Sequence, residues 1–250
     1  MNQKQLESVQ LQEFYHDLFV DTQLEHFCEL CAPLITNRSQ YVVDVGGGCG
    51  YFAHAVAARF ALPSRVIDMD PVSVARCQES GVEAVQGDAL QPPVAGDEGV
   101  VCFNLILHHL VGDSEASTKL LQAQALDRWR NHAKLLFVNE YIYDSYVGGA
   151  AGRLIFAITS NPLLSAVAAM VSKFVPTLRA NTFGVGVRFR GESEWRQFFA
   201  RHGFRVLAHK AGREEDVSLA RRLLLIKSCR RDSFVLQADS LSGRLGVESV

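Results

Sequence analysis

The chain has 250 residues, 48% of them apolar, which is enough to bury one substantial core and corresponds to one domain with an appended cap. The formal net charge is -2 without a dense Lys/Arg block, so the sequence has no electrostatic signature of a DNA or RNA partner. Residues 1–10 lack the apolar core of a secretory signal, and we expect a cytoplasmic protein. Cys28 and Cys31 form a C-x-x-C without a second matching pair, so neither a metal site nor a disulfide framework is predicted.

The first 40 residues predict a helical cap, because apolar side chains recur at helical spacing over residues 5–35. From Tyr41 the pattern changes to short apolar runs that alternate with helical segments, which is typical of a parallel sheet. The strands expected in this part are 41–45, 65–69, 82–86, 99–106 and 134–141. The helices expected between them are 51–61, 71–80 and 115–130.

Beyond Tyr143 the alternation stops, and residues 145–182 predict two or three helices rich in Ala, Leu and Val. A helix over 192–202 and strands over 204–209 and 223–228 then close the domain, before a loosely ordered tail. The predicted regions are a cap (1–40), a cofactor-binding core (41–143), a helical lid (144–190), a closing helix with strands (191–237) and a tail (238–250).

Three glycines stand at every second position after the first strand, Gly46, Gly48 and Gly50, and a helix follows them at once. Such a turn lets the backbone pass close to a ligand. The dinucleotide pattern G-x-G-x-x-G would need glycine at position 51, where this chain has Tyr51, so the spacing excludes a dinucleotide site. Asp44, at the end of the strand, would repel a pyrophosphate but suits a cationic ligand that carries an amino acid.

Two further acidic turns follow the second and third strands. Asp68 stands about 20 residues beyond the glycine turn, where a carboxylate can accept hydrogen bonds from both hydroxyls of a ribose. Asp70 precedes Pro71 and is better explained as the cap of the next helix. Asp88 and Ala89 close the third strand, where they can meet an adenine amino group or form a plain turn.

Taken together, D-V-G-G-G-x-G, D-x-D-P and G-D-A resemble the class I S-adenosylmethionine-dependent methyltransferases over residues 41–140. The resemblance implies an α/β, Rossmann-like sheet of seven strands with the last one antiparallel, here with an N-terminal helical cap and an inserted helical lid. It implies S-adenosylmethionine as the cofactor, bound over the strand ends. The residues that it assigns to the cofactor are Asp44, Gly46, Gly48, Gly50, Asp68, Met69, Asp88, Ala89 and Asn104.

The end of the fourth strand carries the candidate base. His108 and His109 stand in L-H-H-L, at the edge where open α/β sheets bind ligands, and histidine accepts a proton near neutral pH. The motif is similar to L-H-D-W of the plant-type O-methyltransferases, whose histidine is the base, and the match falls on His108. His109 replaces an acidic residue, Leu110 replaces Trp, and the N-terminal dimerisation domain of those enzymes has no counterpart, so a role in shaping the cofactor loop is the alternative.

Other residues near the acceptor side have two interpretations each. Glu140, at the end of the fifth strand, either orients the base or acts itself, or else is a surface or capping carboxylate. Arg188 and Arg190 either clamp an acidic substrate group or form ion pairs within the protein, the simpler explanation. Residues 154–171 form a long apolar run, but Ser, Thr, Asn and Pro interrupt it, so a lid is favoured over a membrane span. A homodimer contact or a membrane-docking surface is the alternative.

The acceptor is expected to be a small, apolar or aromatic molecule. The Asn-Pro-Pro-Tyr signature of amide and adenine-amine methyltransferases is replaced by Asn104-Leu105-Ile106-Leu107, and no Pro-Cys nucleophile is present. We therefore expect methyl transfer to oxygen first, and to nitrogen or carbon next. The alternatives are a non-catalytic binding protein with this fold, and an enzyme that methylates a quinone or lipid at the membrane surface.

Overall fold

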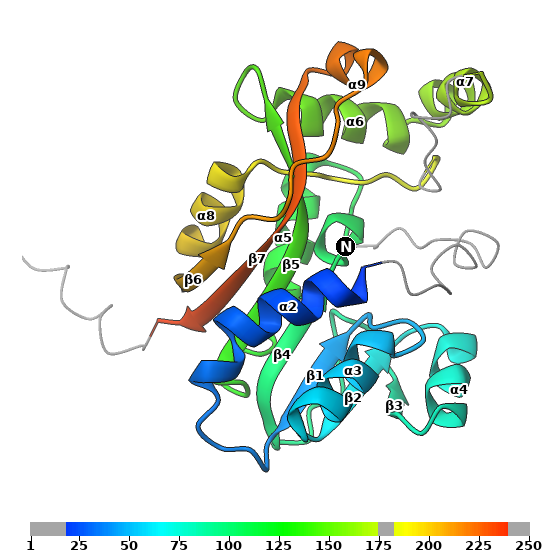
Figure 1. Ribbon diagram of the computed structural model, residues 1–250. Helices are drawn as coiled ribbons and strands as arrows, with labels where there is room; N and C mark the ends of the chain where they lie inside the picture. The colour runs from blue at the N-terminus through cyan, green and yellow to red at the C-terminus, as the bar shows by residue number, and fades with distance from the viewer. Residues whose placement is uncertain (1–18, 175–182, 240–250) are drawn as a thin grey trace, which may run out of the picture.

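The computed structural model describes residues 19–174 and 183–239, which form one mixed sheet of seven strands with helices on both faces (Figure 1). The strands are β1 (Tyr41–Val45), β2 (Ser64–Asp68), β3 (Glu83–Gln86), β4 (Glu98–Asn104), β5 (Leu135–Ser145), β6 (Phe204–Lys210) and β7 (Ile226–Ala238). The helices are α2 (Val20–Leu30), α3 (Tyr51–Phe60), α4 (Pro71–Glu79), α5 (Glu115–Asp127), α6 (Ala150–Ser160), α7 (Pro162–Ser172), α8 (Glu192–Arg201) and α9 (Leu219–Leu223). Two short 3₁₀ helices are η2 (Ala32–Leu34) and η3 (Leu107–His109).

The strand order is β3-β2-β1-β4-β5-β7-β6. Strands β1 to β5 pair in parallel, and β7 runs antiparallel to both β5 and β6. The predicted seven-stranded sheet with its last strand antiparallel is confirmed. Because β1, β2, β4 and β5 are parallel, their carboxyl ends meet at one edge of the sheet, which brings together residues far apart in sequence.

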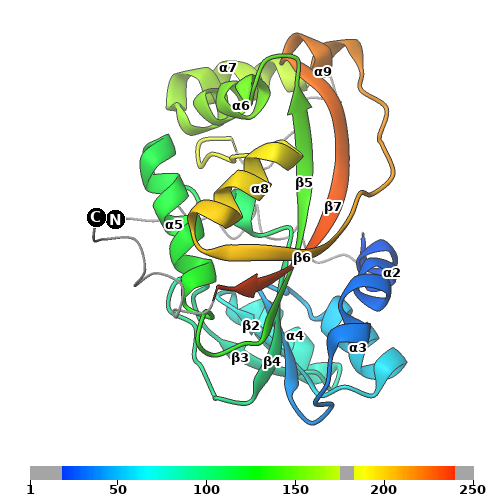
Figure 2. The ribbon, with the colours of Figure 1, turned by 90° about the vertical axis from the view of Figure 1, so that its left-hand side faces the viewer.

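Side chains alternate between the two faces of the sheet, and each face has its own core. Val43 and Phe103 point toward α5 and α8, where they join Trp129 and Trp195 in the largest apolar cluster. Their neighbours on the other face pack against α2 and α3, around Phe27. Figure 2 shows α5 and α8 on one side of the strands and α2 and α3 on the other.

Local sequence signals explain where several helices begin. The Asp70 carboxylate accepts hydrogen bonds from the backbone N–H groups of Val72 and Ser73 and so caps α4, as expected for Asp70-Pro71. Helix α7 begins in the same way, because the Asn161 side chain accepts from the N–H groups of residues 163 and 164 ahead of a proline at the first helical position. Helix α3 starts directly after Gly50, whose φ of 77° is costly for any residue with a Cβ.

The closing strand differs from the prediction over 223–228. Residues 219–223 form α9 instead, and β7 begins at Ile226 and continues to Ala238, into the expected tail. The strand is not evident from the sequence, because the charged residues 230–232 interrupt its apolar pattern. Buried Arg230 donates to Asp232, Asp144 and Glu192 at 2.9, 2.6 and 3.0 Å, and these ion pairs let the strand continue through the interior. Strand β5 is also longer than predicted and ends at Ser145.

The predicted cap and the predicted lid each lie partly outside the described residues. Helix α2 accounts for the second helix expected in residues 5–35, and the first lies mostly outside the described residues. Of the two or three helices expected in 145–182, α6 and α7 are described, whereas residues 175–182 are not. The assignment of residues 144–190 as a lid therefore stays a prediction.

Candidate active site

The glycine turn packs directly against the segment that follows β4. Gly46 has φ 69°, and a Cβ added to it would overlap the Cδ1 atom of Ile106. At Gly50 an added Cβ would lie 2.8 Å from the Cys77 sulfur. Both positions therefore need glycine for two reasons, backbone conformation and space. The contact with Ile106 also places the loop that contains His108 beside the turn.

Asp44 lies at the carboxyl end of β1, where it is 1% exposed. Its Oδ1 atom accepts a hydrogen bond from Asn104 Nδ2, at the end of neighbouring β4, at 2.9 Å. Burial raises the pKa of Asp44 to about 7, the Asn104 hydrogen bond opposes that shift, and the charge of Asp68 adds to it. The Asn104 Oδ1 atom is also buried and has no hydrogen-bond partner among the described residues. A buried carboxylate and an amide oxygen thus stand side by side, both suited to accept from a cation.

Asp68 joins the glycine turn to the end of β2. One carboxylate oxygen accepts from the Gly48 N–H and the other from the Asp70 N–H, both at 2.8 Å. Burial raises the pKa of Asp68, and these two backbone donors counteract the shift. Each oxygen keeps a second lone pair, so the fixed carboxylate can still accept from ligand hydroxyl groups.

Three other predicted cofactor residues surround this edge. Met69 follows Asp68 with a 38% exposed side chain, and its carbonyl oxygen accepts from the Gln86 side chain at 3.2 Å. The Asp88 carboxylate accepts from the Leu90 N–H at 2.9 Å, as expected for a residue that stabilises a plain turn. Its second carboxylate oxygen makes no hydrogen bond to a side chain or N–H group within 19–174 or 183–239. Ala89 is buried in the main core.

His108 and Glu140 form a buried pair across the ends of β4 and β5. Glu140 is fully buried and so is not a surface carboxylate, but it does cap η3, whose first residue is Leu107. One of its oxygens accepts from the Leu107 N–H at 2.7 Å, and the other lies 2.6 Å from His108 Nδ1. A carboxylate beside Nδ1 favours the imidazole tautomer that has its proton on Nδ1, and in that tautomer Nε2 is the acceptor nitrogen. His108 is 3% exposed, and within the described residues its Nε2 atom has no hydrogen-bond partner.

His109 has a different environment from its neighbour. Its ring packs on that of His108, with centroids 4.2 Å apart, and its Nδ1 atom is buried. Burial, with a smaller contribution from the charge of His108, holds the pKa of His109 well below its ordinary value. His109 therefore stays neutral at physiological pH, and its predicted catalytic role is not supported by a geometry like that of His108.

Aromatic rings that the sequence prediction did not single out surround the His108 imidazole. The Phe189 ring lies 4.9 Å from His108 between centroids, and Tyr141 lies 5.9 Å from it, edge to face. Tyr143 stacks on Phe189 at 4.3 Å. Two signals were available in the sequence, since Tyr141 follows Glu140 and Phe189 stands between two arginines. The surroundings of the imidazole are thus apolar and aromatic.

Arg188 and Arg190 form ion pairs within the protein, as the simpler explanation supposed. Both are buried, and both donate to Glu115 at the start of α5, at 2.6 and 3.1 Å. Arg188 also pairs with Glu194, and Arg190 with Gln122. These contacts fix the segment around Phe189 against α5 and α8, and the Arg188 N–H donates to the His108 carbonyl oxygen at 2.9 Å.

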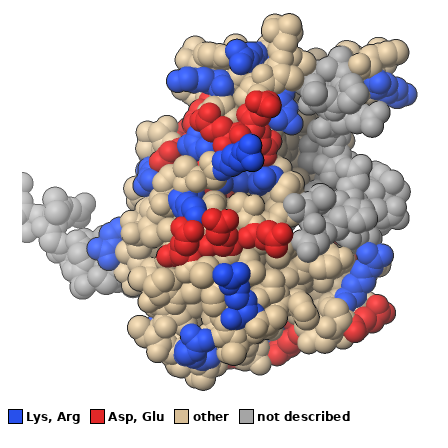
Figure 3. All heavy atoms as spheres, in the orientation of Figure 1, with Lys and Arg blue, Asp and Glu red and all other residues tan. Residues whose placement is uncertain are grey.

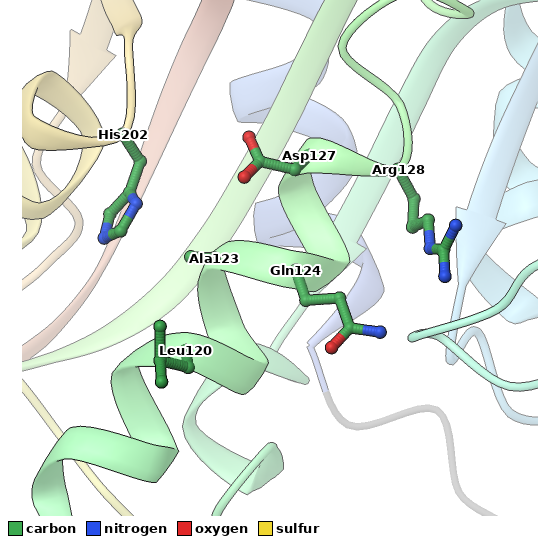
Figure 4. Close-up of a pocket in the computed structure, with 6 residues that line it drawn as sticks. All are labelled: Leu120, Ala123, Gln124, Asp127, Arg128 and His202. Atoms are coloured by element: carbon green, nitrogen blue, oxygen red, sulfur yellow. The ribbon is translucent and has the colours of Figure 1, made fainter. Parts of the chain in front are cut away.

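Two other features lie apart from these residues. Glu192, His209 and Asp232 are close enough to one another to hold a metal ion, but the Arg230 guanidinium already pairs with two of them. A hollow of about 520 Å³ lies between α5 and α8 (Figure 4), and it contains none of the predicted site residues. The residues around it are Leu120, Ala123, Gln124, Asp127, Arg128 and His202.

Leu105, between Asn104 and Ile106, has an unusual backbone conformation that the sequence did not predict. It has φ 57°, a conformation that costs a leucine about 1–2 kcal/mol. Its N–H donates to the Asn139 carbonyl oxygen of β5 at 2.8 Å, which holds the unfavourable backbone in place. Strain of this kind is common at binding sites, and here it directs the chain from the cofactor side toward His108.

Comparison with known proteins identifies the fold but no close relative. No protein-family model matches the chain, and no curated protein matches it. Among solved structures, the MccD protein aligns over 88% of this chain and 96% of its own, with a TM-score of 0.56 and 11% identity. The mitomycin 7-O-methyltransferase MmcR aligns with a TM-score of 0.54 and 18% identity over 88% of this chain, which spans only 54% of MmcR. The [4+2]-cyclase SpnF aligns over 88% of this chain and 80% of its own, with a TM-score of 0.56 and 13% identity. On strand order and on these structural matches, the chain has the class I methyltransferase fold.

Proposed function

We propose that the protein transfers a methyl group from S-adenosylmethionine to a small acceptor. The observation that carries the proposal is that two buried pairs lie at the same edge of the sheet. Asp44 and Asn104 offer oxygens that can accept hydrogen bonds, and His108 of the His108–Glu140 pair follows Asn104 by four residues. The methyltransferases among the solved structures with this fold support it. The fold alone does not decide the reaction, because a [4+2]-cyclase shares it.

The chain's own residues fit such a cofactor. Asp44 and the unpartnered Asn104 oxygen would accept from the cationic methionine end, and Asp68, already fixed by two backbone donors, would accept from the ribose hydroxyls. Gly46 and Gly48 would allow the close approach of the ligand, and Met69, Asp88 and Ala89 would border the adenine. When bound, the cofactor supplies an activated methyl group, so the protein mainly has to align the acceptor with it.

We infer that the acceptor atom is a hydroxyl oxygen and that His108 is the base. Glu140 would hold the imidazole proton on Nδ1, so that Nε2 could take the proton of the acceptor hydroxyl as that oxygen replaces sulfur on the methyl carbon, with S-adenosylhomocysteine as the leaving group. The carboxylate also stabilises the imidazolium that results. Tyr141 and Phe189 beside the imidazole favour an aromatic or apolar acceptor over a charged one.

Binding of the cofactor is tested first. Titration calorimetry with S-adenosylhomocysteine is expected to give a dissociation constant below millimolar. Absence of heat and of thermal stabilisation at millimolar ligand would refute the cofactor proposal, and with it the methyltransferase function.

The base is tested by S-adenosylhomocysteine production from S-adenosylmethionine with a panel of phenols and uncharged alcohols. On an acceptor that turns over, His108→Asn and Glu140→Gln are expected to lower kcat by about 10²–10⁴-fold and to leave S-adenosylhomocysteine affinity within twofold. His54→Asn, at an exposed position on α3, is the matched histidine control. Full turnover by His108→Asn would refute its role as the base and leave only a role in shaping the cofactor loop.

A further inference from the structure

Helix α7 is apolar on the outside and polar on the inside. Its buried residues are Ser165 and Ser172, and the Ser165 hydroxyl donates to backbone carbonyl oxygens of α6 at 2.8 and 2.9 Å. The large apolar residues that are exposed on the helix and its end are Leu163 (79%), Leu164 (47%), Val167 (55%), Met170 (57%), Val171 (41%) and Phe174 (83%), and Lys173 is exposed beside them. A helix in contact with water normally has the opposite arrangement. The outer face of α7 is therefore suited to contact with an apolar surface rather than with water.

A second exposed apolar group lies at the same end of the molecule. Leu219 and Leu223, one turn apart on α9, are 76% and 75% exposed, and Val147, after β5, is 66% exposed. Both views of the ribbon place α7 and α9 at the end to which β5 and β7 extend (Figures 1 and 2). We call the exposed apolar residues of α7, α9 and Val147 the distal face. Two separate segments thus expose large apolar side chains at one end of the molecule, which is more than singly scattered exposed residues explain.

The charged residues within the segments that carry the distal face are basic, although Arg221 pairs at 3.7 Å with Glu215, just outside these segments. Residues 145–174 and 217–227 contain no Asp or Glu. They contain five basic residues outside the buried core, Arg153, Lys173, Arg221, Arg222 and Lys227. Figure 3 shows tan and blue atoms at the tip of this end, with the acidic side chains gathered below it. An apolar surface with a basic border is complementary to an anionic lipid surface.

We propose that the distal face docks the protein on membranes that contain anionic lipids, with α7 lying in the plane of the interface. A second copy is disfavoured as the occupant, because a two-fold contact would bring the same basic side chains together. No single helix within residues 19–174 and 183–239 is long and apolar enough to cross a bilayer. Helices α6 and α7 pass that test only as a pair bent by 99°. Helix α6 is fixed to the protein, because Ala151 and Ile155 pack in an apolar cluster with Ile226 of β7.

The test is flotation of the full-length protein with vesicles of phosphatidylcholine alone or with 30% phosphatidylglycerol. Binding is expected only to the mixed vesicles and is expected to weaken as salt is raised. Leu163→Glu and Leu219→Glu should each weaken it by about tenfold or more. Lys173→Glu and Arg222→Glu should each weaken it by about fivefold or more. Leu120→Glu, at a 51% exposed leucine of α5, and Arg201→Glu, at an exposed arginine of α8, are the matched controls and should bind as the unchanged protein does.

These readouts do not depend on the proposed methyl transfer, so the two proposals can fail separately. Because the altered side chains are exposed, circular dichroism and melting temperature are expected to stay unchanged. Equal binding to both vesicle types, or equal loss in the α5 and α8 controls, would overturn the proposal. A dimer in light scattering that Leu163→Glu dissociates, without vesicle binding, would make the distal face a contact between copies and would also overturn it.

Discussion

Ligand binding at Asp44 should release a proton. In the empty site, burial raises the pKa of Asp44 to about 7, so at pH 6 about nine-tenths of the molecules carry a neutral carboxyl group there. The ammonium group of S-adenosylhomocysteine, placed beside Asp44 and Asn104, favours the ionised form and returns the pKa toward its ordinary value. Binding at pH 6 then releases about 0.9 proton, and binding at pH 7 about 0.5 proton. The affinity should rise about fivefold between these two pH values, because the competent fraction rises from about 0.09 to about 0.5.

Calorimetry in two buffers of different ionisation enthalpy, such as phosphate and imidazole, measures this proton release directly. The Asp44→Asn variant keeps the oxygen that accepts from Asn104 but cannot ionise, so its binding should be independent of pH between 6 and 7. Any remaining proton exchange in that variant belongs to other groups and is subtracted. Proton uptake at pH 6, or the same release from Asp44→Asn, would refute the placement of the cationic end of the ligand at Asp44.

Three further changes probe the same edge of the sheet. Asp68→Ala is expected to weaken S-adenosylhomocysteine binding by about tenfold or more in calorimetry, since hydrogen bonds to a charged group contribute about 1.5–3 kcal/mol each. An unchanged affinity would show that the ribose lies elsewhere. Gly46→Ala should lower the free energy of unfolding by about 1–2 kcal/mol for the positive φ alone, plus the overlap with Ile106. When Ile106→Val is added to Gly46→Ala, it should recover only the stability lost to the overlap, because valine lacks the Cδ1 atom. Urea unfolding measures this, and full recovery would contradict the backbone argument. Because the Asp44 pKa is raised, its contribution to stability is present in acid and lost as pH rises through about 7. The empty Asp44→Asn protein should therefore gain more stability over the unchanged protein at pH 8 than at pH 5, as followed by melting temperature.

The cofactor side of the site could be predicted because its residues follow local rules. Each acidic residue or glycine stands at the end of a strand with a clear apolar pattern, and parallel strands bring such ends together without further information. Asp70 shows the same point, since a helix cap depends only on the two or three residues after it.

The acceptor side depends on contacts between distant residues, which a single sequence does not reveal. Glu140 could not be distinguished from a surface carboxylate until the His108 ring was placed 2.6 Å from it. Strand β7 was predicted too short because Arg230 and Asp232 are charged, and only partners on β5 and α8 make their burial favourable. Helix α7 could not be placed from its composition, because an apolar helix fits both a lid over the acceptor and a docking surface, and only the structure shows that its leucines face outward.

The position of β7 in the sheet has a consequence for folding during synthesis. It is the last strand in sequence among the described residues, yet it lies between β5 and β6 and pairs with both, so residues about 90 positions apart must meet. Until residues 226–238 have left the ribosome, β6 has no strand to pair with and β5 has an open edge, a surface prone to aggregation. Such distant pairing slows folding. The nascent chain is therefore expected to be a chaperone client until its final strand is inserted.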